Sequence, residues 1–417
     1  MRAPWPEVSL TAVADLVRGV SYPKTDSRND AAAGYVPVLR ATNIQDARLV
    51  LESDLVYVAE SNVSPEQRLR PGDIVVATSS GSKHLVGKSA HLHGHWNGSF
   101  GAFCAGIRPK PNIESRYLAY FLQSPRYWKE IGKKALGVNI NNLRRGDLET
   151  LSLPLPPAES QREIVAEIEK QFSRLDEAVA NLLRVKANLK RYKAAVLSDA
   201  VVGDLAGESN RWKEAVLGDV AASVRNGYSQ KPDAEHGTPI LRISAVRPLQ
   251  LNMADVRYLS GVPSDYEQFT LSADDVLFTR YNGSRNYVGI CAQVPVGLRP
   301  TVYPDKLIRV RVPPDALLPA FLVIAAATGQ ARAFIESRIR TTAGQAGISG
   351  ADLKALPLRL PPLAEQHRIV AEVDRRLSIV REVEAEVDAN LKRAQALRQA
   401  VLAAAFRTPC RPLPLPA

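Results

Sequence analysis

The chain has 417 residues, of which 45% are hydrophobic, and this length predicts about two to four globular domains. Its 54 Lys and Arg residues outnumber its 43 Asp and Glu residues, and the net charge of +11 favours a polyanionic partner. The sequence has no apolar run of membrane-spanning length, no secretion signal and only three widely spaced cysteines. We therefore expect a cytoplasmic protein without a membrane partner, a disulfide framework or a cysteine zinc site.

The first 155 residues predict a mixed α/β domain. Short runs rich in β-branched residues, such as 36–41 and 69–76, are bounded by Gly, Pro, Asp and Asn. This pattern is typical of strands joined by turns. A helical stretch is expected at residues 116–123.

Residues 206–360 repeat these features. The run 238–243 echoes 36–41, and the run 271–278 echoes 69–76. A helical stretch is expected at 318–332. Because a match that keeps its order over so many positions indicates a duplicated unit, we predict a second α/β domain of the same kind.

A long helix is predicted after each domain, at residues 156–205 and 361–408. Apolar residues recur in both at steps of three and four, averaging about 3.5, which is the spacing of a coiled-coil seam. A helix of about 40 residues would be ~60 Å long and could not bury its stripe alone, so the two should pair. Antiparallel pairing sets the acidic start of the first helix near the basic end of the second, whereas parallel pairing sets Glu167 beside Glu372.

The predicted fold class is therefore α+β. It consists of two similar mixed α/β domains separated by two long helices that form an antiparallel coiled coil, with an internal pseudo-two-fold repeat.

One motif occurs twice in the sequence and indicates a resemblance to a known family. Residues 155–165 read LPPAESQREIV and residues 360–370 read LPPLAEQHRIV, so that Gln366 follows Gln161 by 205 positions. Further matching features are the RQAVLAAAF ending at 398–406 and Trp212 followed by LGDV at 217–220. Over essentially its whole length, the chain resembles the specificity subunit of type I restriction-modification systems.

The resemblance implies a function. Each α/β domain would be a target-recognition domain that reads one part of a split sequence in double-stranded DNA. The helices would set the unread gap and hold two methyltransferase subunits, and restriction subunits would add ATP-dependent cleavage where they are present. S-adenosylmethionine, ATP and Mg²⁺ would bind these partners, so we expect no cofactor and no catalysis in this chain. The implied parts are target-recognition domain 1 at 1–155, a central helix at 156–205, target-recognition domain 2 at 206–360 and a C-terminal helix at 361–408.

Candidate DNA contacts are polar residues that follow strands or precede the long helices. In the first half they are Arg40, Thr42, Asn43, Ser79, Ser80, Lys83, His84, Asn139 and Asn141. In the second half they are Arg242, Arg280, Asn282, Ser284, Arg285, Asn286 and Gln345. Arg and Lys suit guanine edges and phosphates, and Asn and Gln suit adenine edges. Solvated turns need the same residue types, and Asn141 could instead cap a helical turn.

Other interpretations fit the sequence less well. A methyltransferase acting alone would need an Asn/Asp-Pro-Pro-Tyr/Phe motif, but none of the three Pro-Pro pairs here follows Asn or Asp: the pairs of the repeated motif follow Leu, and the pair at 313–314 follows Val. The segment 81–89 resembles a phosphate-binding loop, although five residues separate its glycines where the motif has four. His91, His93 and His95 lack a nearby carboxylate to complete a metal shell, so no metal site is expected. A non-catalytic scaffold that bridges proteins through its rod stays the alternative, which the charge of +11 disfavours.

Overall fold

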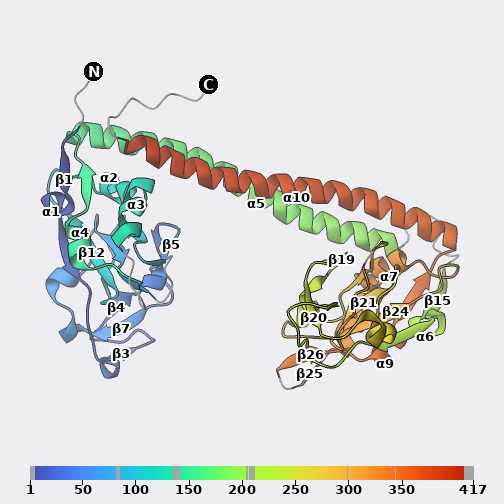
Figure 1. Ribbon diagram of the computed structural model, residues 1–417. Coiled ribbons are helices and arrows are strands. Elements are labelled where there is room, and N and C mark those ends of the chain that lie inside the picture. Colours follow the sequence, from blue (N-terminus) through green and yellow to red (C-terminus); the bar gives the residue numbers. More distant parts are fainter. Residues whose placement is uncertain are drawn as a thin grey trace. The chain divides into compact units, whose positions relative to one another are not determined.

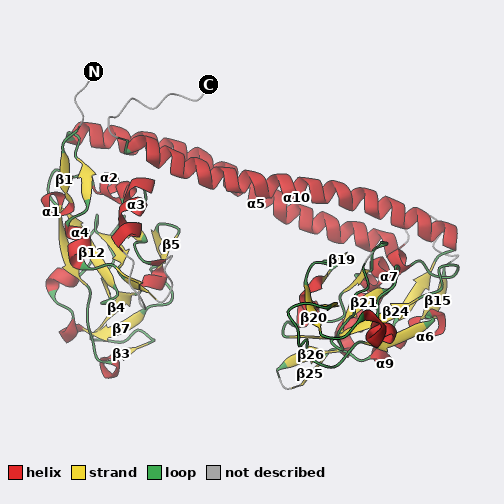
Figure 2. Cartoon of the chain, in the orientation of Figure 1, coloured by secondary structure: helices red, strands yellow, loops and turns green. Residues whose placement is uncertain are grey.

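A computed structural model gives the fold, and it describes residues 5–80, 85–134, 141–202, 205, 212–297, 299–342 and 344–407. The chain divides into two units. Unit 1 is Met1–Leu182 with Ala389–Ala417, and unit 2 is Leu183–Asp388. Each unit contains one α/β domain, the start of one long helix and the end of the other (Figures 1 and 2).

The helices and strands of the first domain, together with the helix that follows it, are β1 (Glu7–Ser9), α1 (Leu10–Val13), β2 (Ala14–Arg18), β3 (Ser27–Arg28), β4 (Tyr35–Leu39), β5 (Ile44–Gln45), β6 (Arg48–Leu49), β7 (Val56–Ala59), β8 (Ile74–Ala77), β9 (Ser79–Ser80), β10 (Ser89–His91), β11 (Ser99–Phe100), β12 (Cys104–Pro109), α2 (Ser115–Phe121), α3 (Pro125–Lys134), β13 (Asn141–Asn142), α4 (Arg145–Glu149), β14 (Ser152–Pro154) and α5 (Ala158–Val202).

Those of the second domain and its helix are β15 (Lys213–Val216), α6 (Leu217–Val220), β16 (Ser223–Asn226), β17 (Thr238–Leu241), β18 (Val246–Arg247), β19 (Gln250–Leu251), β20 (Val256–Leu259), β21 (Val276–Thr279), β22 (Tyr281–Asn282), β23 (Cys291–Gln293), β24 (Leu307–Arg311), α7 (Pro319–Ala326), α8 (Gly329–Arg338), β25 (Arg340–Thr342), β26 (Gln345–Gly347), α9 (Gly350–Lys354), β27 (Pro357–Leu360) and α10 (Leu363–Ala405).

A four-stranded antiparallel sheet forms the centre of each domain. Its order is β10-β8-β12-β2 in unit 1, and unit 2 has the matching order β23-β21-β24-β16. The strand β8 reads Ile-Val-Val-Ala and is buried on both faces, which explains its unbroken apolar run. Ile74 and Val76 pack toward the helices, whereas Val75 and Ala77 pack toward the far layer, as the two-residue period of a strand requires.

The smaller ladders repeat as well. The hairpin β5-β6 corresponds to β18-β19, and the pair β4-β7 corresponds to β17-β20. The first strand of each domain pairs with its last, β1 with β14 and β15 with β27, directly before the long helix begins. The prediction of two similar mixed α/β domains is therefore confirmed.

The helical stretch expected at 318–332 is two helices, α7 and α8. The chain turns between them at Thr328, which is extended, and at Gly329, whose φ of +58° lies in the left-handed region. A residue in the left-handed region cannot continue a right-handed helix, and glycine adopts that conformation at little cost, so the chain breaks into two helices here.

The two long helices pair antiparallel in each unit. In unit 1 the start of α5, from Val165 to Phe172, shares a core with Leu402 at the end of α10 and with Phe406 directly after it. Phe406 packs its ring against Tyr117 and Phe121, with centroids 5.2 and 5.5 Å away.

Unit 2 shows the reverse combination, since Val196 and Ala200 at the end of α5 share a core with Ile369 and Val373 at the start of α10. Ion pairs mark the same direction in both units. Arg398 contacts Asp176 at 2.6 Å in unit 1, and Lys186 contacts Asp388 at 2.6 Å in unit 2. The antiparallel coiled coil is confirmed.

The predicted seam is buried at most but not all of its positions in α10, where Val380, Val387 and Ala394 are buried. Four seam residues, Val185, Tyr192, Val383 and Leu397, are exposed rather than buried. Two helices alone bury only a narrow stripe, so an apolar side chain at the edge of that stripe stays exposed. None of the helices in the described ranges is both long and apolar enough to cross a bilayer.

Candidate nucleic-acid interface

The two candidate loops of the first domain lie side by side. The strand β9 pairs with β13, so that Asn141 faces Ser80 and Asn142 faces Ser79. Segments about 60 positions apart in the sequence therefore present one polar ladder. Three predicted contacts, Lys83, His84 and Asn139, lie outside the described residues, as does the side chain of Asn141.

Backbone hydrogen bonds fix this ladder to the central sheet. The carbonyl of Phe103, just before β12, accepts N–H groups from Thr78 at 2.8 Å and Ser79 at 3.2 Å. The carbonyl of Thr78 accepts the N–H of Leu143 at 2.7 Å. The polar edge is thus hydrogen-bonded directly to the end of the central strands β8 and β12.

Arg40 and Thr42 are held by one carboxylate. The guanidinium of Arg40 forms an ion pair with Asp54 and donates to its backbone carbonyl at 3.1 Å. The hydroxyl of Thr42 donates to the same carboxylate at 2.5 Å. The Arg40 guanidinium and the Thr42 hydroxyl are both exposed, so their remaining donors and acceptors are open to solvent.

Asn43 has a different role from the one predicted. Its side chain is completely buried and caps the turn at Ala41–Asn43. It accepts from the backbone N–H of Arg40 at 2.8 Å and donates to the carbonyls of Val50 and Ser53 at 3.1 and 2.9 Å. A base contact by Asn43 is therefore ruled out by burial, and its amide instead shapes the loop that carries Arg40.

A cavity connects these groups. It has a volume of about 480 Å³ and is lined by Arg40, Thr42 and Ser79 together with the apolar side chains of Tyr22 and Phe103. The strand-end residues and the ladder residues, predicted as separate candidates, therefore share one concave surface in the first domain.

The second domain builds the same ladder with other side chains. The strand β26 lies between β22 and β25, so that Asn282 faces Ala346 next to Gln345, and Thr341 faces Ala346 from the other side. The predicted pair of loops is again brought together. Arg340 and Thr341 of β25 are exposed on this sheet and were not predicted.

Arg280 leads into this ladder. Its guanidinium carbon lies 4.7 Å from the centre of the Tyr281 ring, and its Nη1 donates to the carbonyl of Asp305 at 3.3 Å. Within the described ranges, its Nε and the Oγ1 of neighbouring Thr279 are buried without a hydrogen-bond partner. Such unsatisfied polar atoms are uncommon in folded proteins.

The other predicted residues of this loop divide into internal and outward-facing groups. Arg285 donates to the carbonyl of Glu336 at 2.9 Å, and the Asn282 side chain accepts from the Ser284 N–H at 2.9 Å. Asn286 is exposed. The loop is therefore braced by Arg285 while it presents amides and hydroxyls to solvent.

The Arg–carboxylate–hydroxyl arrangement is duplicated. Arg242 lies 3.6 Å from the carboxylate of Asp255, and Ser244 donates to that carboxylate. These residues match Arg40, Asp54 and Thr42 of the first domain. Exposed ion pairs add little stability, but in each domain the carboxylate fixes the direction of a planar guanidinium.

A buried glutamine ties each domain to its long helix. Gln161 accepts from the backbone N–H of Glu114 and donates to the Pro156 carbonyl, both at 2.9 Å. Gln366 accepts from the N–H of Leu318 at 2.8 Å and donates to the carbonyls of Ala316 and Pro361 at 3.1 and 3.0 Å. These are the glutamines of the repeated motif, which explains why it contains an amide.

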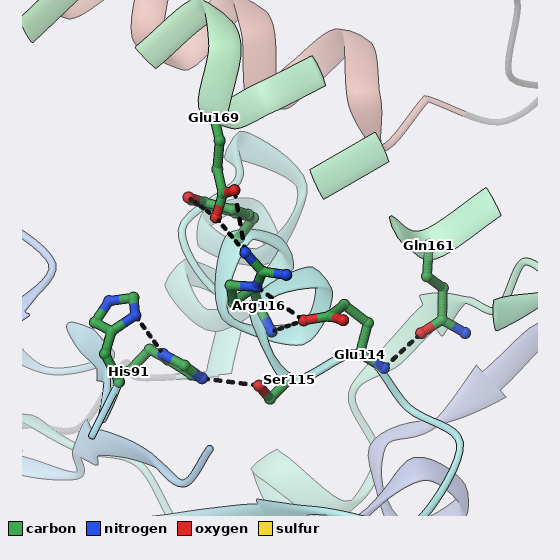
Figure 3. A network of polar contacts seen from close by, with 8 residues as sticks. His91, Glu114, Ser115, Arg116, Gln161 and Glu169 are labelled. Carbon is green, nitrogen blue, oxygen red and sulfur yellow. Dashed lines mark hydrogen bonds and ion pairs between the residues drawn. The ribbon is translucent and has the colours of Figure 1, made fainter. Parts of the chain in front are cut away.

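Unit 1 adds an ionic contact at the same junction. Figure 3 shows Arg116 between Glu114 and Glu169, with its guanidinium 3.0 and 3.1 Å from their carboxylates. Hydrogen bonds to Arg116 lower the pKa of Glu114 against the opposing effect of burial. The first domain is therefore held to α5 by an amide and a charged network.

The histidines at this junction are hydrogen-bonded within the protein. His91 lies 2.9 Å from the Ser115 hydroxyl and 3.3 Å from the ring nitrogen of His93. Burial, assisted by His93 and Arg116, lowers the pKa of His91 to about 4. The described residues contain no group of three His, Cys, Asp or Glu side chains that could hold a metal ion.

Comparison with known proteins defines the family. The family model for the type I restriction modification DNA specificity domain matches residues 3–184. The chain is 37% identical over 415 residues to the EcoKI specificity subunit of Escherichia coli (strain K12), covering 97% of this chain and 88% of that protein. It is 32% identical over 410 residues to the StySPI specificity subunit of Salmonella potsdam, with the same 97% and 88% coverage.

Solved structures share the fold. A chain from work on complex assembly and conformational transition of the type I R-M system has a TM-score of 0.74 at 20% identity, covering 98% of both chains. The HsdS subunit from Thermoanaerobacter tengcongensis has a TM-score of 0.53 at 21% identity, covering 97% of this chain and 96% of that one. With its duplicated domains, its antiparallel helices and these relatives, the chain belongs to the family of type I restriction-modification specificity subunits.

Proposed function

We propose that this chain is the DNA-recognition subunit of a type I restriction-modification complex, in which each α/β domain reads one half of a bipartite target. The observation that carries the proposal is the duplicated polar ladder with unlike side chains. Ser79 and Asn142 occupy the ladder in the first domain, whereas Asn282 and Gln345 occupy it in the second. Two readers with one framework and different side chains would recognise two different half-sites.

The chemistry of the exposed groups suits DNA. Serine, asparagine and glutamine side chains offer donors and acceptors to base edges, and Arg40 and Arg242 offer oriented guanidinium groups to phosphates or guanine. The net charge of +11 supports attraction to a polyanion, with an affinity that falls as salt rises.

The long helices would act as a spacer and a docking surface. Their antiparallel pairing in each unit and their anchoring glutamines support a fixed gap between the half-sites. Apolar side chains that stay exposed on them, including Leu183, Tyr192 and Ile379, support contact with partner proteins. In this proposal the surface binds two methyltransferase subunits. Restriction subunits join the complex in systems that encode them.

Catalysis would belong to the partners. In this proposal the methyltransferase subunits bind S-adenosylmethionine, the restriction subunits use ATP and Mg²⁺, and the chain itself supplies recognition in the cytoplasm, where the chromosome lies. Family membership supports this division of labour.

A pair of matched substitutions tests the assignment of half-sites. In the complex with methyltransferase subunits, Asn282→Ala should relax or abolish recognition of one half-site, and Asn142→Ala should affect only the other. Binding to duplexes mutated in one half-site at a time gives the readout. Loss confined to the same half-site for both variants would contradict the assignment, and a complex that binds no specific DNA would favour a protein-bridging scaffold.

A further inference from the structure

One apolar side chain projects from the candidate interface of the first domain. Phe103 is 68% exposed, although it lies between two buried strand ends. The turn that carries it is tightly fixed, because Ala102 donates to the Val20 carbonyl at 2.9 Å and Cys104 donates to the Gly101 carbonyl at 2.8 Å. The exposure therefore results from a defined backbone position.

The surroundings of Phe103 are those of the polar ladder. Its carbonyl accepts the N–H groups of Thr78 and Ser79, and its side chain lines the cavity that also contains Arg40 and Thr42. A ligand that reaches Ser79 would therefore pass next to the ring of Phe103.

The equivalent position in the second domain is Lys306. The carbonyl of Lys306 accepts the N–H of Arg280 at 2.8 Å, just as the carbonyl of Phe103 accepts that of Thr78. Lys306 precedes β24 as Phe103 precedes β12. One backbone position thus carries an aromatic ring in one domain and a cation in the other, which is the kind of difference expected where two domains read different bases.

We propose that Phe103 contacts the 5-methyl group of a thymine in the half-site read by the first domain. The inference rests on the proposed function, because it requires that this surface binds DNA. A phenyl ring forms no conventional hydrogen bond with a base edge. The 5-methyl of thymine is the apolar group that unmodified bases display in the major groove, and apolar side chains recognise it. Lys306 would instead contact a phosphate in the second half-site.

Removing single methyl groups from the DNA tests the contact. Each thymine of the target is replaced in turn by 2′-deoxyuridine, and the affinity of the complete complex with its methyltransferase subunits is measured. Loss of one buried methyl is expected to weaken binding about four-fold at one position of the first half-site. The same replacements in the second half-site serve as the internal control.

Variants of Phe103 connect the effect to this residue. Phe103→Ala should bind thymine and deoxyuridine duplexes equally, and Phe103→Leu should keep the preference because it keeps an apolar side chain. Because the ring is exposed, both variants should unfold at the wild-type temperature. A preference that survives in Phe103→Ala, or a first half-site without any A·T pair, would overturn the proposal.

The outcome also separates this inference from the proposed function. If Asn142→Ala alters reading of the first half-site while Phe103→Ala leaves the deoxyuridine effect unchanged, only the thymine contact is wrong. If neither variant affects that half-site, the location of the DNA-binding surface is wrong. Phe103→Ala could also weaken binding to the thymine and deoxyuridine duplexes by the same factor, so that the preference for thymine persists. That result would indicate a ring inserted between base steps and would also overturn the thymine contact.

Discussion

Replacing Gln366 with alanine tests how the repeated motif works. The side chain is 1% exposed and makes three hydrogen bonds, to the N–H of Leu318 and to the carbonyls of Ala316 and Pro361. An unsatisfied buried group costs about 1–3 kcal/mol, and partial entry of water reduces the sum. We expect Gln366→Ala to lower the free energy of unfolding of unit 2 by ~3 kcal/mol.

Gln161 supplies a matched comparison in unit 1. It makes two such hydrogen bonds, to the N–H of Glu114 and the carbonyl of Pro156, so Gln161→Ala should cost ~2 kcal/mol. Gln345→Ala, at an exposed position, should change stability by less than about 0.5 kcal/mol. The Gln366 variant should therefore be the least stable of the three.

Amide hydrogen exchange measures the effect at the affected bond. In Gln366→Ala the Leu318 amide should exchange much faster, while the Glu114 amide keeps its wild-type rate, and Gln161→Ala should show the reverse. Urea unfolding of the same variants gives the free energies. Wild-type exchange at Leu318 in Gln366→Ala, with an unchanged urea midpoint, would refute the anchoring role.

Three further predictions concern stability and spacing. Phe406→Ala should destabilise unit 1 by ~3–5 kcal/mol, because its ring fills the core between α2 and the helices; an unfolding midpoint equal to the wild type would contradict this packing. Burial lowers the pKa of His91 in the folded protein from 6.5 to about 4, so the unfolded chain binds a proton first as the pH falls. The free energy of unfolding should therefore decrease by up to ~3 kcal/mol between pH 6.5 and about 4. His91→Gln should remove this dependence in urea titrations. Inserting about four residues, one helical turn, between Val179 and Leu189 should change the gap in the methylated motif and leave both half-sites unchanged; an altered half-site would contradict the spacer.

The fold was largely predictable because its determinants are local or repeated. The apolar run before Ser79 and its echo before Arg280 predict buried strands, and the period of about 3.5 predicts the paired helices. The exposed Tyr192 and Val383 were not predictable, since periodicity reports a stripe and not which part of it finds a partner. The break at Gly329 depends on a backbone angle that composition does not reveal.

The candidate interface was predictable only by residue type. Polar residues after strands suggested both loop pairs, but their pairing depends on register across distant segments. The burial of Asn43 was not predictable, and neither was the pairing of Asp54 with Arg40 or of Asp255 with Arg242. These contacts join residues 7 to 14 positions apart, which no local sequence pattern reports. Phe103 was not predicted as a contact, because a single phenylalanine beside a strand usually belongs to the core.

Sequencing of the methylated DNA tests the central claim most directly. The complex of this chain with its methyltransferase subunits is expected to methylate a motif made of two short, different sequence blocks separated by a gap of constant length. A continuous palindromic motif, or two blocks separated by variable gaps, would contradict the account of two unlike readers held by one helical spacer.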